Sequence, residues 1–181
     1  MITTFVLNAP PDEEYRGNLL DMSFVLDSDS HWYTRYLLPK ADALYFPPGD
    51  SPALIEGLKA IKLTAKDVEG KLVLAYSAGV SALTTHSFNF DHIHLVDGLG
   101  IIPFCSIVHY TPAKDWAADY LCLKFGLDVL KVDDSHKCIL RMENGRVMRQ
   151  EWIELPKPQA VSPLYAYNDG HGLGLPTPQQ E

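Results

Sequence analysis

Short apolar runs bounded by turn residues alternate along the chain with stretches of helical spacing. Apolar residues dominate the segments 42–46 and 71–75, as is typical of parallel strands that are buried on both faces. Between these segments, Leu54, Leu58 and Ile61 recur at helical spacing and predict a helix over 52–62 with one face toward the core. This alternation predicts an α/β fold, in which helices flank a mostly parallel sheet in three layers.

The same pattern predicts further elements on either side of this central unit. Strands are expected at 3–7, 24–26 and 93–96, and helices at 32–38 and 113–125. Near the end of the pattern, 137–142 and 146–152 flank an Asn-Gly pair and predict a C-terminal β-hairpin. We therefore expect one domain over 1–155, followed by an extended Pro/Gly-rich tail over 156–181.

A serine lies in the turn between the predicted strand 71–75 and a helix-like stretch that begins near Val80. The sequence of this turn is Tyr-Ser-Ala-Gly, with Ser77 as its second residue. A tight strand-to-helix turn of this kind raises a serine hydroxyl above the end of a sheet, where it can act as a nucleophile. The alternative is an ordinary strand-helix connection without chemistry, since short motifs often match by chance.

A second loop of the same kind follows the strand 42–46. It reads Pro-Pro-Gly-Asp and leads into a helix with Ser51 as the expected N-cap and Pro52 at the first helical position. Such loops gather at the carboxyl ends of parallel strands, so the backbone amides of Gly49 and Ala78 are expected to form an oxyanion hole. The alternative for this loop is a Pro-Gly turn.

His109 ends an apolar segment downstream of the serine and is the candidate general base, which a serine nucleophile requires. A cysteine in the same apolar segment, Cys105, is a weaker candidate nucleophile because buried cysteines are usually inert. The three cysteines of the chain are widely spaced and indicate reduced thiols rather than a disulfide framework.

Together, the loop 47–50, the Ser-Ala-Gly turn at 77–79 and the segment 98–110 (Gly-Leu-Gly through Pro-Phe to His-Tyr) resemble the peptidase E family of aspartyl dipeptidases and their cyanophycinase relatives. The resemblance covers roughly residues 41–150. It implies the class I glutamine amidotransferase-like fold, which is flavodoxin-like, and no cofactor. It also implies Ser77 as nucleophile and His109 as base, with an oxyanion hole at Gly49 and Ala78.

The resemblance further implies an acid between the serine and the histidine, where the chain has only Asp91 and Asp97. Asp97 lies in the Asp-Gly-Leu-Gly segment, where a structural role is expected, so Asp91 is the predicted acid. Asp134 resembles an acidic position in a later turn of the family and is the alternative. An aspartate in this role would hold the imidazole tautomer and stabilise the imidazolium.

Two positions bear on the substrate. Asp50 takes the place of the family's loop asparagine, so we expect it to contact substrate. The family's dipeptidases hold the substrate aspartyl group with an arginine, but this chain has no arginine between Tyr110 and Leu130. Lys114 is the expected substitute. Because lysine lacks the bidentate fork of arginine, specificity for Asp-Xaa substrates is expected to be poor.

The net charge of −8 argues against a nucleic-acid partner, which would require a basic surface. The N-terminal residues have neither the basic region nor the apolar core of a signal peptide, so we expect a cytoplasmic protein without membrane insertion. His92 and His94 would share a face of a strand, with His86 nearby, but we predict no metal site because convergent further ligands are not evident.

These observations favour a serine peptidase or amidase that acts on small peptides or related amides, with a homodimer as a possible state. The alternative is a catalytically weak or inactive relative that serves as a binding or assembly module. The altered loop at 47–50 and the missing arginine favour this alternative, whereas the intact serine and histidine favour the enzyme.

Overall fold

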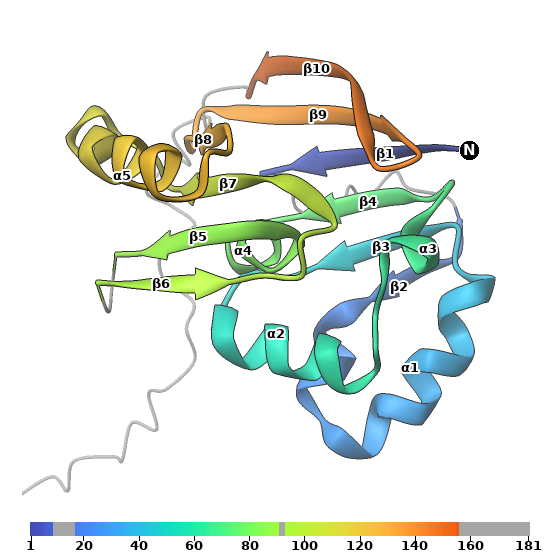
Figure 1. Cartoon of the computed structure of the whole chain (residues 1–181). Coiled ribbons are helices and arrows are strands. Elements are labelled where there is room, and N and C mark those ends of the chain that lie inside the picture. The colour runs from blue at the N-terminus through green and yellow to red at the C-terminus, as the bar shows by residue number, and fades with distance from the viewer. Residues whose placement is uncertain (9–16, 91–92, 156–181) are drawn as a thin grey trace, which may run out of the picture.

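The computed structural model describes residues 1–8, 17–90 and 93–155 of the chain, and it has an α/β fold with two mixed sheets and flanking helices (Figure 1). The predicted tail 156–181 lies outside the described residues. The larger sheet has the strand order β10-β9-β1-β4-β3-β2 and the smaller one β6-β5-β7-β8. The strands are β1 (Ile2–Leu7), β2 (Leu19–Asp21), β3 (Ala43–Phe46), β4 (Leu72–Ala75), β5 (Thr84–Asn89), β6 (His94–Asp97), β7 (Ile102–Val108), β8 (Val129–Val132), β9 (His136–Glu143) and β10 (Arg146–Glu154).

The helices lie around these sheets. The short helix α4 contacts both sheets and connects β4 of the larger sheet with β5 of the smaller one. In Figure 1, α1 and α2 lie below the larger sheet, and α5 lies beside the smaller sheet. The α-helices are α1 (His31–Leu37), α2 (Ser51–Ala60), α3 (Ala65–Val68), α4 (Ala78–Leu83) and α5 (Asp115–Phe125), with 3-10 helices at Met22–Leu26, Ser28–Ser30, Leu38–Lys40 and Pro112–Lys114.

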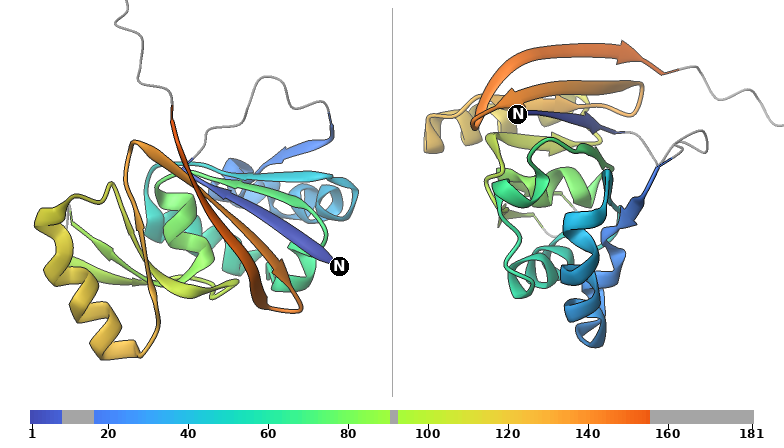
Figure 2. Two further views of the ribbon diagram at one scale, coloured as in Figure 1. Left: turned by 90° about the horizontal axis from the view of Figure 1, so that it is seen from above. Right: turned by 90° about the vertical axis from the view of Figure 1, so that its right-hand side faces the viewer.

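The strand pairs are mostly parallel as expected, but they are divided between two sheets rather than one, and each sheet is mixed. Strands β1, β4, β3 and β2 are parallel to one another, whereas β9 pairs antiparallel with both β1 and β10. In the smaller sheet, β5, β7 and β8 are parallel and β6 is antiparallel to β5. Figure 2 shows the two sheets from above and from the side.

The main hydrophobic core lies around the central parallel strands, which are buried as their apolar runs predict. All four residues of β3 are buried, and the predicted helical stripe of Leu54, Leu58 and Ile61 is 0–5 % exposed. A second, smaller cluster joins the smaller sheet to α5 and contains Phe88, Cys105, Ile107, Ala117, Ala118 and Leu121.

Two local expectations are wrong. The segment Met22–Leu26 is a 3-10 helix rather than a strand, because the Asp21 carboxylate accepts the Ser23 N–H at 2.8 Å and caps the turn. The N-cap of α2 is Asp50 rather than Ser51. Its carboxylate accepts the Ala53 N–H at 3.0 Å, and the helix begins at Ser51.

Candidate active site

Ser77 lies between β4 and α4 in a sparsely populated backbone conformation. Its φ and ψ angles are 47° and −106°, a region that non-glycine residues occupy only when the surrounding structure holds them there. The Tyr76 N–H donates to the carbonyl of Phe46 at 3.1 Å, which fastens the turn to the end of β3. The serine is therefore held at the carboxyl ends of two adjacent parallel strands.

Gly79 is required for this close packing of α4 against β3. A Cβ atom built at position 79 would lie 2.2 Å from the carbonyl oxygen of Phe46, which is shorter than any real contact of that kind. Because both groups belong to the backbone, neither can move aside without shifting an element. The third residue of the Ser-Ala-Gly sequence must therefore be glycine, because no side chain fits at position 79.

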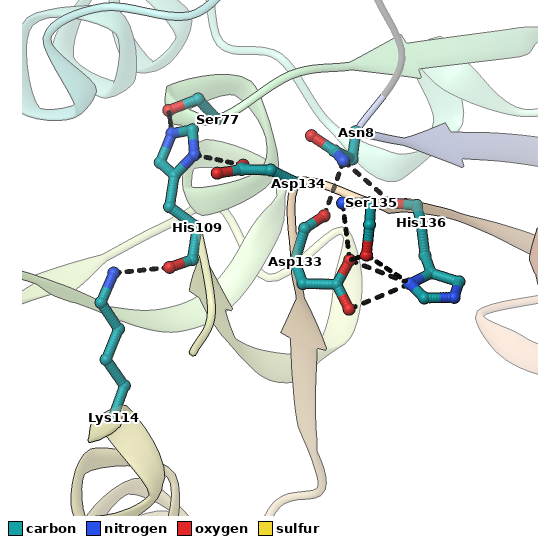
Figure 3. Close-up of polar contacts among 8 residues, drawn as sticks. All are labelled: Asn8, Ser77, His109, Lys114, Asp133, Asp134, Ser135 and His136. Carbon is teal, nitrogen blue, oxygen red and sulfur yellow. Dashed lines mark hydrogen bonds and ion pairs between the residues drawn. The ribbon is translucent and has the colours of Figure 1, made fainter. Parts of the chain in front are cut away.

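His109 immediately follows β7 and points toward the serine from the smaller sheet (Figure 3). Its Nε2 atom lies 2.9 Å from the Oγ of Ser77, so the contact predicted from the sequence is present. The histidine has a positive φ of 50°, and the next residue, Tyr110, donates its N–H to the Val132 carbonyl at 3.0 Å. This bond ties the histidine turn to the end of β8.

Asp134 provides the carboxylate that contacts the other ring nitrogen of His109. Its Oδ1 lies 2.6 Å from Nδ1, within a short hydrogen bond (Figure 3). The structure therefore moves the acid from Asp91, the first choice from the sequence, to the alternative Asp134. Asp91 itself lies outside the described residues. Asp97 instead accepts a hydrogen bond from Nδ1 of His86 at 2.8 Å.

The turn that carries Asp134 is fixed by Asn8, which sequence reasoning did not identify. Asn8 is 4 % exposed, and its side-chain amide donates to the carbonyls of Asp133 at 2.7 Å and His136 at 2.8 Å. Its own N–H donates to the carbonyl of Ala75, next to the serine turn. A single buried asparagine therefore connects the nucleophile strand with the acid turn. A polar residue directly after an apolar strand was the signal available in the sequence.

The side chain of Asp133 also stabilises this turn, through hydrogen bonds to residues within it. Its Oδ1 accepts the N–H and the hydroxyl of Ser135, both at 2.8 Å, and lies 3.0 Å from Nδ1 of His136. Burial acts to raise the pKa of Asp133, but the hydrogen bonds from Ser135 and His136 outweigh it and lower the pKa. The side chain of Asp133 thus remains ionised and structural, while the neighbouring Asp134 faces the imidazole.

The two residues predicted to form an oxyanion hole, Gly49 and Ala78, lie next to the serine in the cleft and in the chain. Ala78 is the first residue of α4, where an N–H has no acceptor within the helix. Gly49 has a φ of +125°, which only glycine adopts readily, and lines the cleft beside Ser77. The positive end of the helix also favours negative charge at this place.

A cleft of about 340 Å³ opens beside the Ser77–His109 pair. Lys114 lines it, with the Nζ atom donating to the His109 carbonyl at 2.6 Å and lying 4.4 Å from the ring centroid of Phe90. Asp50 is exposed and uses Oδ1 to cap α2, so its contact with substrate stays a prediction. The cleft is lined by Gly49, Ser51, Ser77, Ser81, Phe88, Asn89, Phe90, Val108, His109 and Lys114.

The helix that follows Lys114 is fastened to the smaller sheet by a polar triad. The Asp115 carboxylate accepts hydrogen bonds from the Tyr110 hydroxyl at 2.7 Å and from Nζ of Lys131 at 2.6 Å. The bonds from Lys131 and Tyr110 lower the pKa of Asp115. Tyr110 follows His109, so these contacts link α5 to the histidine turn.

The remaining candidates from the sequence lie apart from this chemistry. Cys105 is fully buried, and burial raises the pKa of its thiol to about 11, which makes it a poor nucleophile near neutral pH. His86 stacks on Phe125 with ring centroids 3.6 Å apart.

Within the described part of the chain, no group of three or more His, Cys, Asp or Glu side chains is arranged to hold a metal ion. Among the same residues, no helix is long and apolar enough to cross a membrane.

No model of a protein family matches the chain, and none of the curated proteins is significantly similar to it.

Proposed function

We propose that the chain is a serine hydrolase that cleaves small peptides or related amides by acylation of Ser77. Two consecutive contacts carry this proposal. Ser77 Oγ lies 2.9 Å from His109 Nε2, and His109 Nδ1 lies 2.6 Å from Asp134 Oδ1. A serine, a histidine and an aspartate in this order of contact are the parts that acyl transfer needs.

In the proposed reaction, Ser77 Oγ attacks the substrate carbonyl carbon while His109 Nε2 accepts the hydroxyl proton. The negative charge that develops on the carbonyl oxygen is bound by the N–H groups of Gly49 and Ala78. His109 then gives its proton to the leaving amine, and the C–N bond breaks. Water attacks the acyl-enzyme by the reverse route, with His109 again as base, and releases the carboxylic acid. Asp134 holds the Nδ1–H tautomer and stabilises the imidazolium in both steps.

The finer assignment is to the peptidase E and cyanophycinase kind of serine peptidase, with a class I glutamine amidotransferase-like, flavodoxin-like, three-layer fold and a C-terminal hairpin. It is supported by the motifs at 47–50, 77–79 and 98–110 and by the loops at the ends of β3, β4 and β7. A cleft of about 340 Å³ is at the small end of ligand sites and suits a dipeptide-sized substrate. We assign the enzyme to the cytoplasm because its three widely spaced cysteines indicate reduced thiols.

The test is hydrolysis of a panel of dipeptides and aminoacyl p-nitroanilides by the full chain and by two serine variants. Ser77→Ala is expected to abolish turnover, because it removes the nucleophile. Ser28→Ala, at an exposed site in a distant 3-10 helix, is the matched control and should keep full activity. Turnover that survives Ser77→Ala would contradict the proposal. No turnover on any amide by the folded wild-type chain would favour the binding or assembly module instead.

A further inference from the structure

The outer strand β10 is a long, open edge of the larger sheet. Within the described residues, β10 pairs with β9 on one side and has no strand on the other. It spans nine residues, whereas β2 at the opposite edge of the sheet spans three. An edge of this length exposes a row of backbone donors and acceptors that can pair with another strand. Figure 1 shows β10 at the top of the molecule, and only its last residues adjoin the turn that carries Asp134.

This edge exposes large apolar side chains of the kind that interfaces bury. Met148, Trp152 and Ile153 are 62 %, 42 % and 39 % exposed. Natural edge strands are shielded by shortness, by proline, by bulges or by charged residues, above all lysine. β10 is long and has no proline or lysine, and its protection is limited to arginines, glutamates and one bulge. A bulge between Val147 and Arg149 is its one irregular feature, and regular pairing with β9 continues from Arg149 to Glu154. Exposed tryptophan and methionine are enriched in protein interfaces.

An arginine of β10 lies beside an arginine of the neighbouring strand β9. Arg149 lies directly opposite Arg141 of β9, so two like charges are neighbours across the strand pair. Directly opposite residues have Cβ atoms about 5 Å apart, and like charges at this distance are destabilising. Arg149 is relieved by an ion pair with Glu151 on its own strand. Glu151 pairs with Arg149, and Arg141 adds a second positive charge beside that pair, so a second carboxylate at the open edge would balance the two arginines.

A second copy of β10 supplies that carboxylate by symmetry. If two β10 strands pair antiparallel about a twofold axis through Gln150, positions at equal distances from Gln150 face one another. Arg149 then lies opposite Glu151 of the second copy, and Glu151 opposite Arg149, so both copies gain the same pair. Met148 at the bulge comes next to Trp152 of the second copy, which brings apolar surface together. A parallel, in-register arrangement would instead set Arg149 against Arg149, which is unfavourable.

We propose that β10 is a homodimerisation edge, at which two copies pair antiparallel about Gln150 and join their larger sheets into one continuous sheet. This arrangement is isologous and closed, as most soluble dimers are. It requires no residue of the candidate active site, so it stands or falls independently of the proposed function.

Sedimentation velocity of the full chain over a range of concentrations tests this proposal. Wild type is expected to dimerise, and Arg149→Glu or Glu151→Arg alone is expected to raise the dimer dissociation constant at least tenfold, because each places like charges opposite one another. The double variant Arg149→Glu/Glu151→Arg restores both pairs with exchanged signs and should recover dimerisation. Lys59→Glu on α2 is exposed, makes the same charge change as Arg149→Glu away from the edge, and should leave the dimer unchanged.

Hydrogen exchange identifies the surface directly. The amides of 149–154 should become more protected as the protein concentration rises in wild type, but not in Arg149→Glu. A chain that stays monomeric, or a dimer that both single variants leave intact, would overturn the proposal. Protection, in a dilute monomer, of those β10 amides that do not bond to β9 would also overturn it, because another segment of the same chain would then cover the edge.

Discussion

Val108 and Val132 are register partners in the parallel pair of β7 and β8, and this pairing brings His109 and Asp134 together. His109 is the first residue after Val108, and Asp134 is the second after Val132. Because both strands are parallel, both residues emerge at the same edge of the smaller sheet. The aspartate reaches the imidazole from a neighbouring strand rather than from the interval between serine and histidine.

The position of Asp134 predicts a large effect of its amide variant. Asp134→Asn is expected to lower kcat by about 10³ to 10⁴-fold, because an asparagine favours the wrong imidazole tautomer and cannot stabilise the imidazolium. The measurement is kcat and KM on the best dipeptide found in the substrate panel. Asp91→Asn is the matched comparison and should stay within a few-fold of wild type. The opposite ranking of these two variants would return the role of acid to Asp91.

Asn8 is expected to act as a positioning residue through the acid turn. Asn8→Gly tolerates the positive φ of 64° at this site but removes both bonds to the turn carbonyls. Loss of two partly buried hydrogen bonds should cost about 1–3 kcal/mol of unfolding free energy. It should also lower kcat about tenfold with little change in KM, because Asp134 loses its fixed place.

Urea unfolding and steady-state kinetics check this prediction together. A variant that loses stability but keeps the wild-type kcat would show that Asn8 is merely structural.

Lys114 is expected to give weak selection for an aspartyl side chain. Its ammonium already donates to the His109 carbonyl and lies over the Phe90 ring, and it lacks the fork that holds a carboxylate in two bonds. We expect the kcat/KM for Asp-Leu to exceed that for Ala-Leu by less than about a hundredfold, or about 2.7 kcal/mol. A larger preference would show that another cation reads the carboxylate. Lys114→Arg should increase the preference if the lysine faces the substrate.

The cysteines should differ in reactivity with pH. Burial raises the pKa of Cys105 to about 11 and that of Cys138 to about 12, so both thiols stay neutral at pH 8, whereas Cys122 is exposed. Iodoacetamide at pH 8 is therefore expected to modify Cys122 alone in the folded protein. Cys105 should react only as the pH approaches 11 or after unfolding. Mass spectrometry of tryptic peptides measures this, and rapid modification of Cys105 at pH 8 would contradict its burial.

Much of this architecture could be predicted from the sequence, because the central strands are apolar runs. The segments around β1, β3, β4 and α2 were expected close to their observed bounds, since a strand buried on both faces has an unmistakable composition. The strand β5 has the sequence Thr-Thr-His-Ser-Phe-Asn and was not predicted. Its polar residues lack the apolar run expected of a strand that pairs on both sides. The short strands β2 and β8 were missed because three or four residues carry little periodicity.

The site was predictable only where it depends on local turns. The Ser77 turn and the end of β7 each have a local sequence signal, and the contact between Ser77 and His109 follows from where these strands end. The acid depends on which strand lies beside β7, and that is a matter of sheet order that no local pattern contains. Asn8 follows β1, which is far from Asp134 in the sequence, so no local pattern relates these two residues.

The most direct test of the central claim is covalent labelling of Ser77 by a fluorophosphonate. Only a serine whose proton is drawn away by a base reacts readily with this reagent. We predict one adduct per folded chain, located at Ser77 by mass spectrometry, and its loss in both His109→Ala and the denatured wild type. A folded chain whose Ser77 remains unlabelled, or is labelled equally in His109→Ala, would contradict the assignment of Ser77 and His109 as an activated pair.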